Sequence, residues 1–249
     1  MTDDADLAAD LAALIAACES DLGDPNLWFE PDGYPDSLAL CIIDSIYSTG
    51  ARYSSVVNIV SRYREYRNQQ GGDADTDGAD ELLAAITEVG GPDDWATQIG
   101  NRRPTSTKGG APLKAETITA LAKALPERGV RTTSDLRTAA TKPEGLTQVK
   151  RAWLATPGQG SGITWDYALM LAQLPGVKAD RMVIKYVARA IGVPPEKLSP
   201  QRAAQLVTRV AEVKRWNPIH LDHAIWRFES GRPFQRDEPN EEGDEPEED

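Results

Sequence analysis

A glycine-punctuated turn between two helical patterns contains the residue types best suited to binding an anion. Pro157 ends the preceding helix, and the glycines that follow permit positive φ angles and a close approach by another backbone. The next helix then begins with amides that have no intrahelical partner, and such amides bind phosphate. The same string also fits an ordinary helix–helix turn. The turn residues that we expect to meet a phosphate backbone are Pro157, Gly158, Gln159, Gly160 and Gly162.

A single carboxylate follows this turn, because Asp180 lies 20 positions after Gly160. Asp180 starts a further helical pattern, where an aspartate caps the helix and has its anionic form stabilised. A carboxylate can also stabilise an oxocarbenium-like sugar or activate water for attack at C1′. A second Leu-Pro-Gly-Val string at 174–177 is a rival turn, but no aspartate follows Val177 at a comparable distance. We therefore predict that Asp180 is the catalytic group.

Three local stretches, taken in their order and with their spacing, form one pattern. Residues 154–160 form a Leu-Pro-Gly-x-Gly string extended by Ala155-Thr156, residues 177–183 carry Asp180, and residues 113–118 read Leu-Lys-Ala-Glu-Thr-Ile. Together they resemble the hairpin, the aspartate segment and a preceding helix of the helix-hairpin-helix (HhH-GPD) DNA glycosylases of the endonuclease III superfamily. The resemblance extends loosely over residues 37–231.

The resemblance implies a monofunctional DNA glycosylase that hydrolyses the N-glycosidic bond of a damaged, mismatched or modified base and leaves an abasic site. Bifunctional relatives use a hairpin lysine that attacks C1′, and Gly162 stands at the matching position here. Lys178, as a displaced nucleophile, is the less favoured alternative. Iron-sulfur relatives bind their cluster through C-terminal cysteines, whereas no cysteine follows Cys41. We therefore expect no cofactor.

Base release in a duplex requires an extruded nucleotide, a pocket of aromatic and polar groups, and a side chain that fills the gap. Trp165, Asp166 and Tyr167 follow the hairpin and are the pocket candidates. The turn at 48–53 has no counterpart of the glutamine that fills the gap in the family, so Arg52 or Tyr53 would take that role. A surface arginine and a core tyrosine are equally good readings of these two residues.

Basic side chains near these motifs are candidates for phosphate contacts. Residues 101–110 form a basic loop rich in glycine and hydroxyl groups, without the residue order of a P-loop. An ordinary solvent-exposed loop explains it equally well. His220 and His223 with Asp222 are too few ligands to indicate a metal, so we expect none. The candidate phosphate contacts are Arg102, Arg103, Lys108, Lys178 and Arg181.

Charge is segregated along the chain, although the formal net charge is -12. Residues 1–100 hold 20 acids and 4 bases, residues 101–236 hold 10 acids and 23 bases, and residues 237–249 hold 9 acids and no base. The three stretches therefore carry -16, +13 and -9. The basic stretch includes the turn, and a local basic surface favours binding to a phosphate backbone.

Apolar residues recur at three and four positions, which predicts an all-α protein. We expect two helical subdomains that contain a helix-hairpin-helix, with the site in the cleft between them. Residues 37–174 would form a helical barrel that ends in the hairpin, and residues 175–236 a second subdomain that carries Asp180. An acidic helical segment at 1–36 would pack on the second subdomain. Residues 237–249 have the composition of a disordered acidic tail.

Two cysteines and no apolar run of membrane-spanning length favour a reducing, cytoplasmic and nucleoid-associated location. We expect a monomer whose partner is double-stranded DNA and not a membrane. Two alternatives stay open beside a repair glycosylase. One is an antiphage glycosylase that removes modified bases from phage DNA, and the other is a non-catalytic DNA-binding protein that has kept the hairpin.

Overall fold

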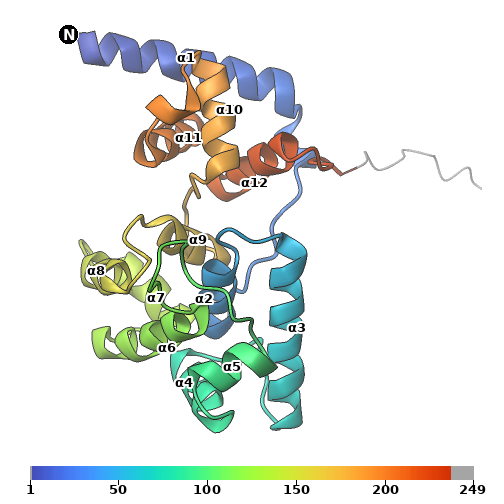
Figure 1. Cartoon of the computed structure of the whole chain (residues 1–249). Helices are drawn as coiled ribbons and strands as arrows, with labels where there is room; N and C mark the ends of the chain where they lie inside the picture. The colour runs from blue at the N-terminus through green and yellow to red at the C-terminus, as the bar shows by residue number, and fades with distance from the viewer. Residues whose placement is uncertain (1, 237–249) are drawn as a thin grey trace, which may run out of the picture. The chain divides into compact units, whose positions relative to one another are not determined.

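The computed structural model describes residues 2–236 of the chain, with side chains from residue 7 onward. Its helices are shown in Figure 1. β-Structure within this range is limited to two isolated bridges, Trp28–Gln235 and Pro104–Leu113. The all-α prediction is therefore confirmed for the described residues. The acidic tail predicted at 237–249 lies outside them.

The chain divides into two compact units. Unit 1 combines Met1–Pro31 with the chain from Ala179, and unit 2 is Asp32–Lys178. The boundaries expected from the sequence fell after residues 36 and 174. No helix in the described range is both long and apolar enough to cross a bilayer.

Unit 2 contains eight α-helices in its described residues, and α2 is its central element. All ten residues of α2 are buried, and the helix contacts α3, α4, α6 and α9. Ser37 caps α2, because its Oγ accepts a hydrogen bond from the Leu40 amide at 3.2 Å. The helices are α2 (Leu38–Tyr47), α3 (Tyr53–Gln69), α4 (Ala79–Glu88), α5 (Pro92–Gln98), α6 (Lys114–Ala124), α7 (Thr133–Ala140), α8 (Thr147–Ala155) and α9 (Ile163–Leu171).

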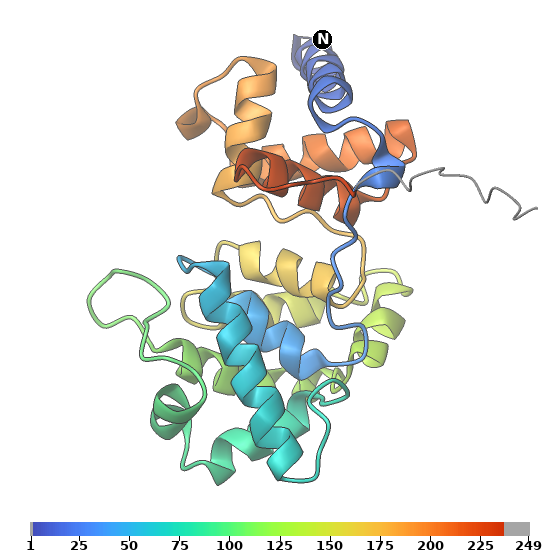
Figure 2. The same cartoon turned by 90° about the vertical axis from the view of Figure 1, so that its right-hand side faces the viewer.

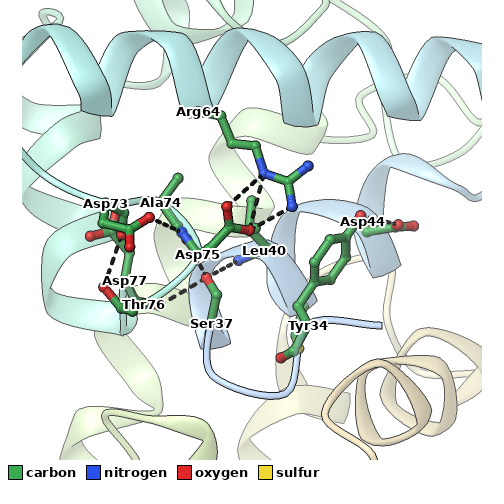
Figure 3. A network of polar contacts seen from close by, with 11 residues as sticks. Tyr34, Ser37, Leu40, Asp44, Arg64, Asp73, Ala74, Asp75, Thr76 and Asp77 are labelled. Carbon is green, nitrogen blue, oxygen red and sulfur yellow. Dashed lines mark hydrogen bonds and ion pairs between the residues drawn. The ribbon is translucent and has the colours of Figure 1, made fainter. Parts of the chain in front are cut away.

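An acidic loop at 71–78 is fixed to unit 2 by a buried carboxylate. Asp77 accepts hydrogen bonds from the Tyr63 hydroxyl at 2.7 Å and from Nε of Arg67 at 2.6 Å. The Ser37 hydroxyl donates to the carbonyl of Ala74 at 2.7 Å. Arg64 pairs with Asp75 in the same loop, as Figure 3 shows. The loop therefore packs against α2 and α3 through satisfied polar groups.

In its described residues, unit 1 contains four α-helices that contact one another: α1 (Thr2–Leu22), α10 (Arg181–Ile191), α11 (Pro200–Lys214) and α12 (Pro218–Glu229). The segment after α1 is anchored by Trp28, whose Nε1 donates to the carbonyl of Leu22 at 2.7 Å. The Trp28 ring also packs edge-on against Trp216 with centroids 5.2 Å apart. These contacts help to hold together the helical unit in which Asp180 caps α10.

Candidate functional site

The turn between α8 and α9 is braced from inside by three buried side chains. Gln159 is 3% exposed, and its Oε1 accepts a hydrogen bond from the Thr164 hydroxyl at 2.6 Å. The same hydroxyl accepts a hydrogen bond from Nε1 of Trp153 at 3.0 Å. The brace links the end of α8, the turn and the first residues of α9. Gln159, predicted as a DNA contact, is therefore an internal support of the turn.

The glycines of the turn adopt the backbone shapes that the sequence indicated. Gly158 and Gly162 have φ angles of +84° and +81°, in the left-handed region. A β-carbon on Gly160 would meet no atom of the described residues within 4 Å, so this position faces open space. Pro157, Gly158 and Gly160 are exposed. They form the edge of the turn that a ligand can approach, beside the first amides of α9, which have no intrahelical acceptor.

The basic loop at 101–112 lies against this exposed edge. Its neck is closed by the Pro104–Leu113 bridge and by a hydrogen bond from the Thr105 amide to the carbonyl of Pro112 at 2.9 Å. Thr105 packs so closely on Gly158 that a β-carbon there would lie 2.6 Å from Oγ1 of Thr105. The loop tip extends away from the helices in Figure 2.

A hollow of about 450 Å³ lies between the loop and the turn. Residues from both segments line it, including Thr105, Ser106, Lys108, Gly110, Gly158 and Gly160. Hydroxyl groups, backbone amides and the Lys108 ammonium surround this space, which suits an anionic group. The structure thus brings the predicted hairpin together with one of the predicted phosphate contacts, Lys108.

The other basic candidates differ in their surroundings. Arg103 is exposed beside the neck of the loop. Arg102 is exposed and pairs with Asp93 at 2.9 Å. Arg181 is exposed at the first position of α10, in unit 1.

Asp180 is the N-cap of α10. Its Oδ1 accepts hydrogen bonds from the amides of Met182 at 2.8 Å and Val183 at 3.2 Å. Both bonds go to Oδ1, so Oδ2 has no hydrogen-bond donor among the described residues. The carboxylate is half-buried and rigidly oriented by the helix. It can present one oxygen to a developing positive charge or to a water molecule.

The three pocket candidates on α9 lie in different surroundings. Trp165 is 3% exposed and packs edge-on against Trp153, with ring centroids 5.7 Å apart. Helical phase turns this ring, predicted as part of a base pocket, into the core of unit 2. Asp166 is half-buried, and burial raises the pKa of its carboxyl while Lys150 opposes the rise. The Tyr167 side chain lies close to the buried carboxyl group of Asp44.

Asp44 is fully buried in α2 and is surrounded by polar and aromatic groups from several elements. The Tyr34 hydroxyl donates to Oδ2 of Asp44 at 3.0 Å, and these two residues are drawn in Figure 3. Tyr167 also forms a side-chain hydrogen bond with Asp44. Nζ of Lys178 lies 3.5 Å from the centroid of the Tyr167 ring. We refer to Tyr34, Asp44, Tyr53, Tyr167 and Lys178 as the Asp44 cluster.

The electrostatics of the cluster centre on Asp44. Burial raises the pKa of its carboxyl to about 6, and the rise is limited by Lys178 and by hydrogen bonds from Tyr34 and Tyr167. Burial and the Asp44 charge likewise raise the pKa of Tyr167 well above its ordinary value. Oδ1 of Asp44 is buried and has no hydrogen-bond partner within the described residues. Such an acceptor is unusual in a folded protein and needs an explanation.

Lys178 was predicted as a phosphate contact, but its surroundings are different. Its ammonium covers the Tyr167 ring, lies 3.4 Å from Oγ of Ser48 and offsets the Asp44 charge. These contacts place Lys178 in the Asp44 cluster, apart from the residues that line the hollow beside the turn.

Asp44 was not among the candidates predicted from the sequence, although a signal for it was present. It is the only charged residue in the ten-residue run of α2, Leu-Ala-Leu-Cys-Ile-Ile-Asp-Ser-Ile-Tyr. A charge inside an otherwise apolar central helix must be paired or functional, because burying an unpaired charge is costly. The amino-acid pattern of this helix alone is therefore enough to mark Asp44 as a candidate.

The gap-filling candidates lie at the start of α3. Arg52 is the N-cap residue of this helix and makes no capping bond with its side chain. Tyr53 is 41% exposed and Val57, one turn later, is 45% exposed. Tyr53 also interacts electrostatically with Tyr34 and Tyr167. The two candidates are therefore exposed residues at the start of α3, and Tyr53 belongs to the Asp44 cluster.

Comparison with known proteins gives a family and no function. Among the described residues, no group of three or more histidine, cysteine, aspartate or glutamate side chains is arranged to hold a metal ion. No curated protein and no solved structure matches the chain. Residues 12–230 match the family described as "Domain of unknown function (DUF8548)". The chain therefore belongs to this DUF8548 family.

Proposed function

We propose that this protein is a monofunctional DNA glycosylase, which hydrolyses the N-glycosidic bond of a damaged, mismatched or modified base and leaves an abasic site. The observation that carries the proposal is the braced turn between α8 and α9, whose exposed glycines share a hollow with the basic loop. This arrangement fits a DNA phosphate, because backbone amides and Lys108 converge on one space. The sequence resemblance to HhH-GPD glycosylases supports the same assignment.

Asp180 supplies the carboxylate in this proposal. As the base leaves, the sugar becomes oxocarbenium-like, and the anionic carboxylate stabilises that charge or orients the attacking water. The N-cap bonds to Met182 and Val183 hold the group in one orientation and favour its anionic form. The leaving base takes the electron pair of the broken C1′–N bond, and water supplies the oxygen at C1′.

The same residues explain why base release is not followed by strand cleavage. Gly162 stands where a bifunctional relative has its lysine, and its φ of +81° is unfavourable for any side chain. Lys178 is engaged with the Asp44 cluster. No Schiff base with C1′ is therefore proposed.

A non-catalytic DNA-binding protein is the second candidate. It is favoured by one observation, which is that the capping bonds of Asp180 already give this aspartate a structural role. Such a protein would bind duplex DNA through the same turn and would release no base.

The proposal is tested with purified protein and a panel of duplexes that carry deaminated, alkylated, oxidised, mismatched and naturally hypermodified bases. Strand breaks that appear only after alkali would reveal abasic sites and support the proposal. Breaks without alkali would show that a lysine attacks C1′ and would contradict the monofunctional assignment. Salt-sensitive binding without base release on any duplex would favour the non-catalytic alternative. Release confined to hypermodified phage-type bases would point to antiphage defence.

A further inference from the structure

The proposed function leaves the Asp44 cluster unused, although it contains the most unusual carboxyl group of unit 2. Asp44 is fully buried, and its Oδ2 is bonded to the Tyr34 hydroxyl, while Oδ1 has no partner in the part of the chain that the structure describes. Buried acceptors in native proteins are nearly always satisfied. This oxygen is itself buried, so a ligand can reach it only where a neighbouring side chain moves aside.

Aromatic and cationic side chains surround this carboxyl group from separate segments. Tyr34 precedes α2, Tyr53 begins α3, Tyr167 lies in α9, and Lys178 follows α9. The cluster reaches the surface through Tyr53, which is 41% exposed, while Tyr167 and Lys178 are half-buried. Aromatic faces next to a few fixed polar groups are typical of sites that hold planar heterocycles.

We propose that the Asp44 cluster recognises the hydrogen-bonding edge of a nucleobase, with Oδ1 of Asp44 accepting an N–H from the base and the Tyr167 ring stacking on it. The inference rests on the proposed function and names the chemistry of its substrate. The Lys178 ammonium covers the Tyr167 ring in the present structure, so the base displaces it. A carboxylate is an acceptor only, and the site therefore selects bases that offer an amino or imino N–H.

The charge state of the site follows from the groups that face Asp44. These are Tyr34, Tyr167 and Lys178, with Cys41 on the same helix. Burial raises the pKa of both tyrosines and of the Cys41 thiol, so these groups stay neutral near pH 7. Asp44, with a pKa of about 6, changes charge between pH 7.5 and 5. Protonation would replace its acceptor by a hydroxyl, so base binding should weaken as the pH falls through about 6.

The test measures equilibrium binding of 9-methyladenine, 1-methylcytosine and 1-methyluracil to the full chain by ligand-observed NMR. Their further methylated analogues N6,N6,9-trimethyladenine, N4,N4,1-trimethylcytosine and 1,3-dimethyluracil serve as probes without any N–H. We expect at least one base to bind, and its analogue to bind about tenfold more weakly or less, because loss of a buried hydrogen bond penalises the complex. Asp44→Asn should weaken the same interaction. Asp77→Asn, which changes a buried carboxyl whose hydrogen-bond partners Tyr63 and Arg67 lie outside the cluster, should not.

Two results would overturn the inference: no binding of any base, or binding that ignores both methylation and Asp44→Asn. If Asp44→Asn fails to fold, base binding to the wild type is measured as a function of pH in its place. Binding that does not weaken as the pH falls through about 6 would reject the inference. Base binding without base release would retain the recognition site and reject the glycosylase. Base release with full activity in Asp44→Asn would retain the glycosylase and reject the recognition site.

Discussion

Removing the Thr164 hydroxyl should destabilise the turn between α8 and α9 more than its size suggests. Thr164→Val keeps the shape of the side chain but leaves Nε1 of Trp153 without an acceptor and Oε1 of Gln159 without a donor. All three residues are at most 4% exposed, so water cannot replace the lost bonds. At about 1–3 kcal/mol for each unsatisfied buried group, partly relieved by relaxation, we expect a loss of about 2–4 kcal/mol.

The assay for Thr164→Val is urea unfolding combined with hydrogen exchange of residues 147–171. Exchange gives a local free energy, which is needed because two units can unfold separately. Thr164→Ser keeps the hydroxyl and loses only a methyl group, so we expect a cost of about 1 kcal/mol from the missing buried carbon. If Thr164→Val proves no less stable than Thr164→Ser, the brace does not hold the turn and our account of it is wrong.

Three further predictions follow from the same geometry. Gly162→Ala should lower the free energy of unfolding in urea by about 1 kcal/mol, because the residue has a φ of +81°. The nearest atom to the new β-carbon is 3.7 Å away, so backbone strain is the only cost, and an unchanged urea midpoint would refute it. Lys108→Ala should reduce the salt dependence of duplex binding by about one phosphate contact, whereas an unchanged slope would place the DNA elsewhere. Asp44 binds a proton more tightly in the folded state, with a pKa of about 6 against 3.8, so its contribution to stability should fall by about 2 kcal/mol as pH rises from 4 to 7. Unfolding of wild type and Asp44→Asn across that range checks the sign, and parallel pH profiles would contradict it.

The helices could be predicted from the sequence because their signals are local. The apolar run at 37–49 indicated a central helix, and α2 is buried at every position. Pro157 and the following glycines marked the turn between α8 and α9, since proline and left-handed glycines act through their own backbone.

The functional surroundings were harder to predict because they depend on residues far apart in the chain. Trp165 and Tyr167 are two positions apart on α9, yet one enters the core and the other joins Asp44. Lys178 is 134 residues from Asp44, so no local pattern revealed their interaction. Gln159 looked like an exposed turn residue because the brace depends on the packing of two helices.

The central claim is that Asp180 performs chemistry in addition to capping α10. Asparagine and serine both cap helices well but carry no negative charge. We would therefore measure the rate of alkali-revealed abasic site formation by wild type, Asp180→Asn and Asp180→Ser, together with thermal stability and duplex affinity. The account predicts that both variants keep near-wild-type stability and DNA binding while base release falls by about 10²-fold or more, as expected for loss of an acid–base group. Base release at the wild-type rate in either variant would contradict it.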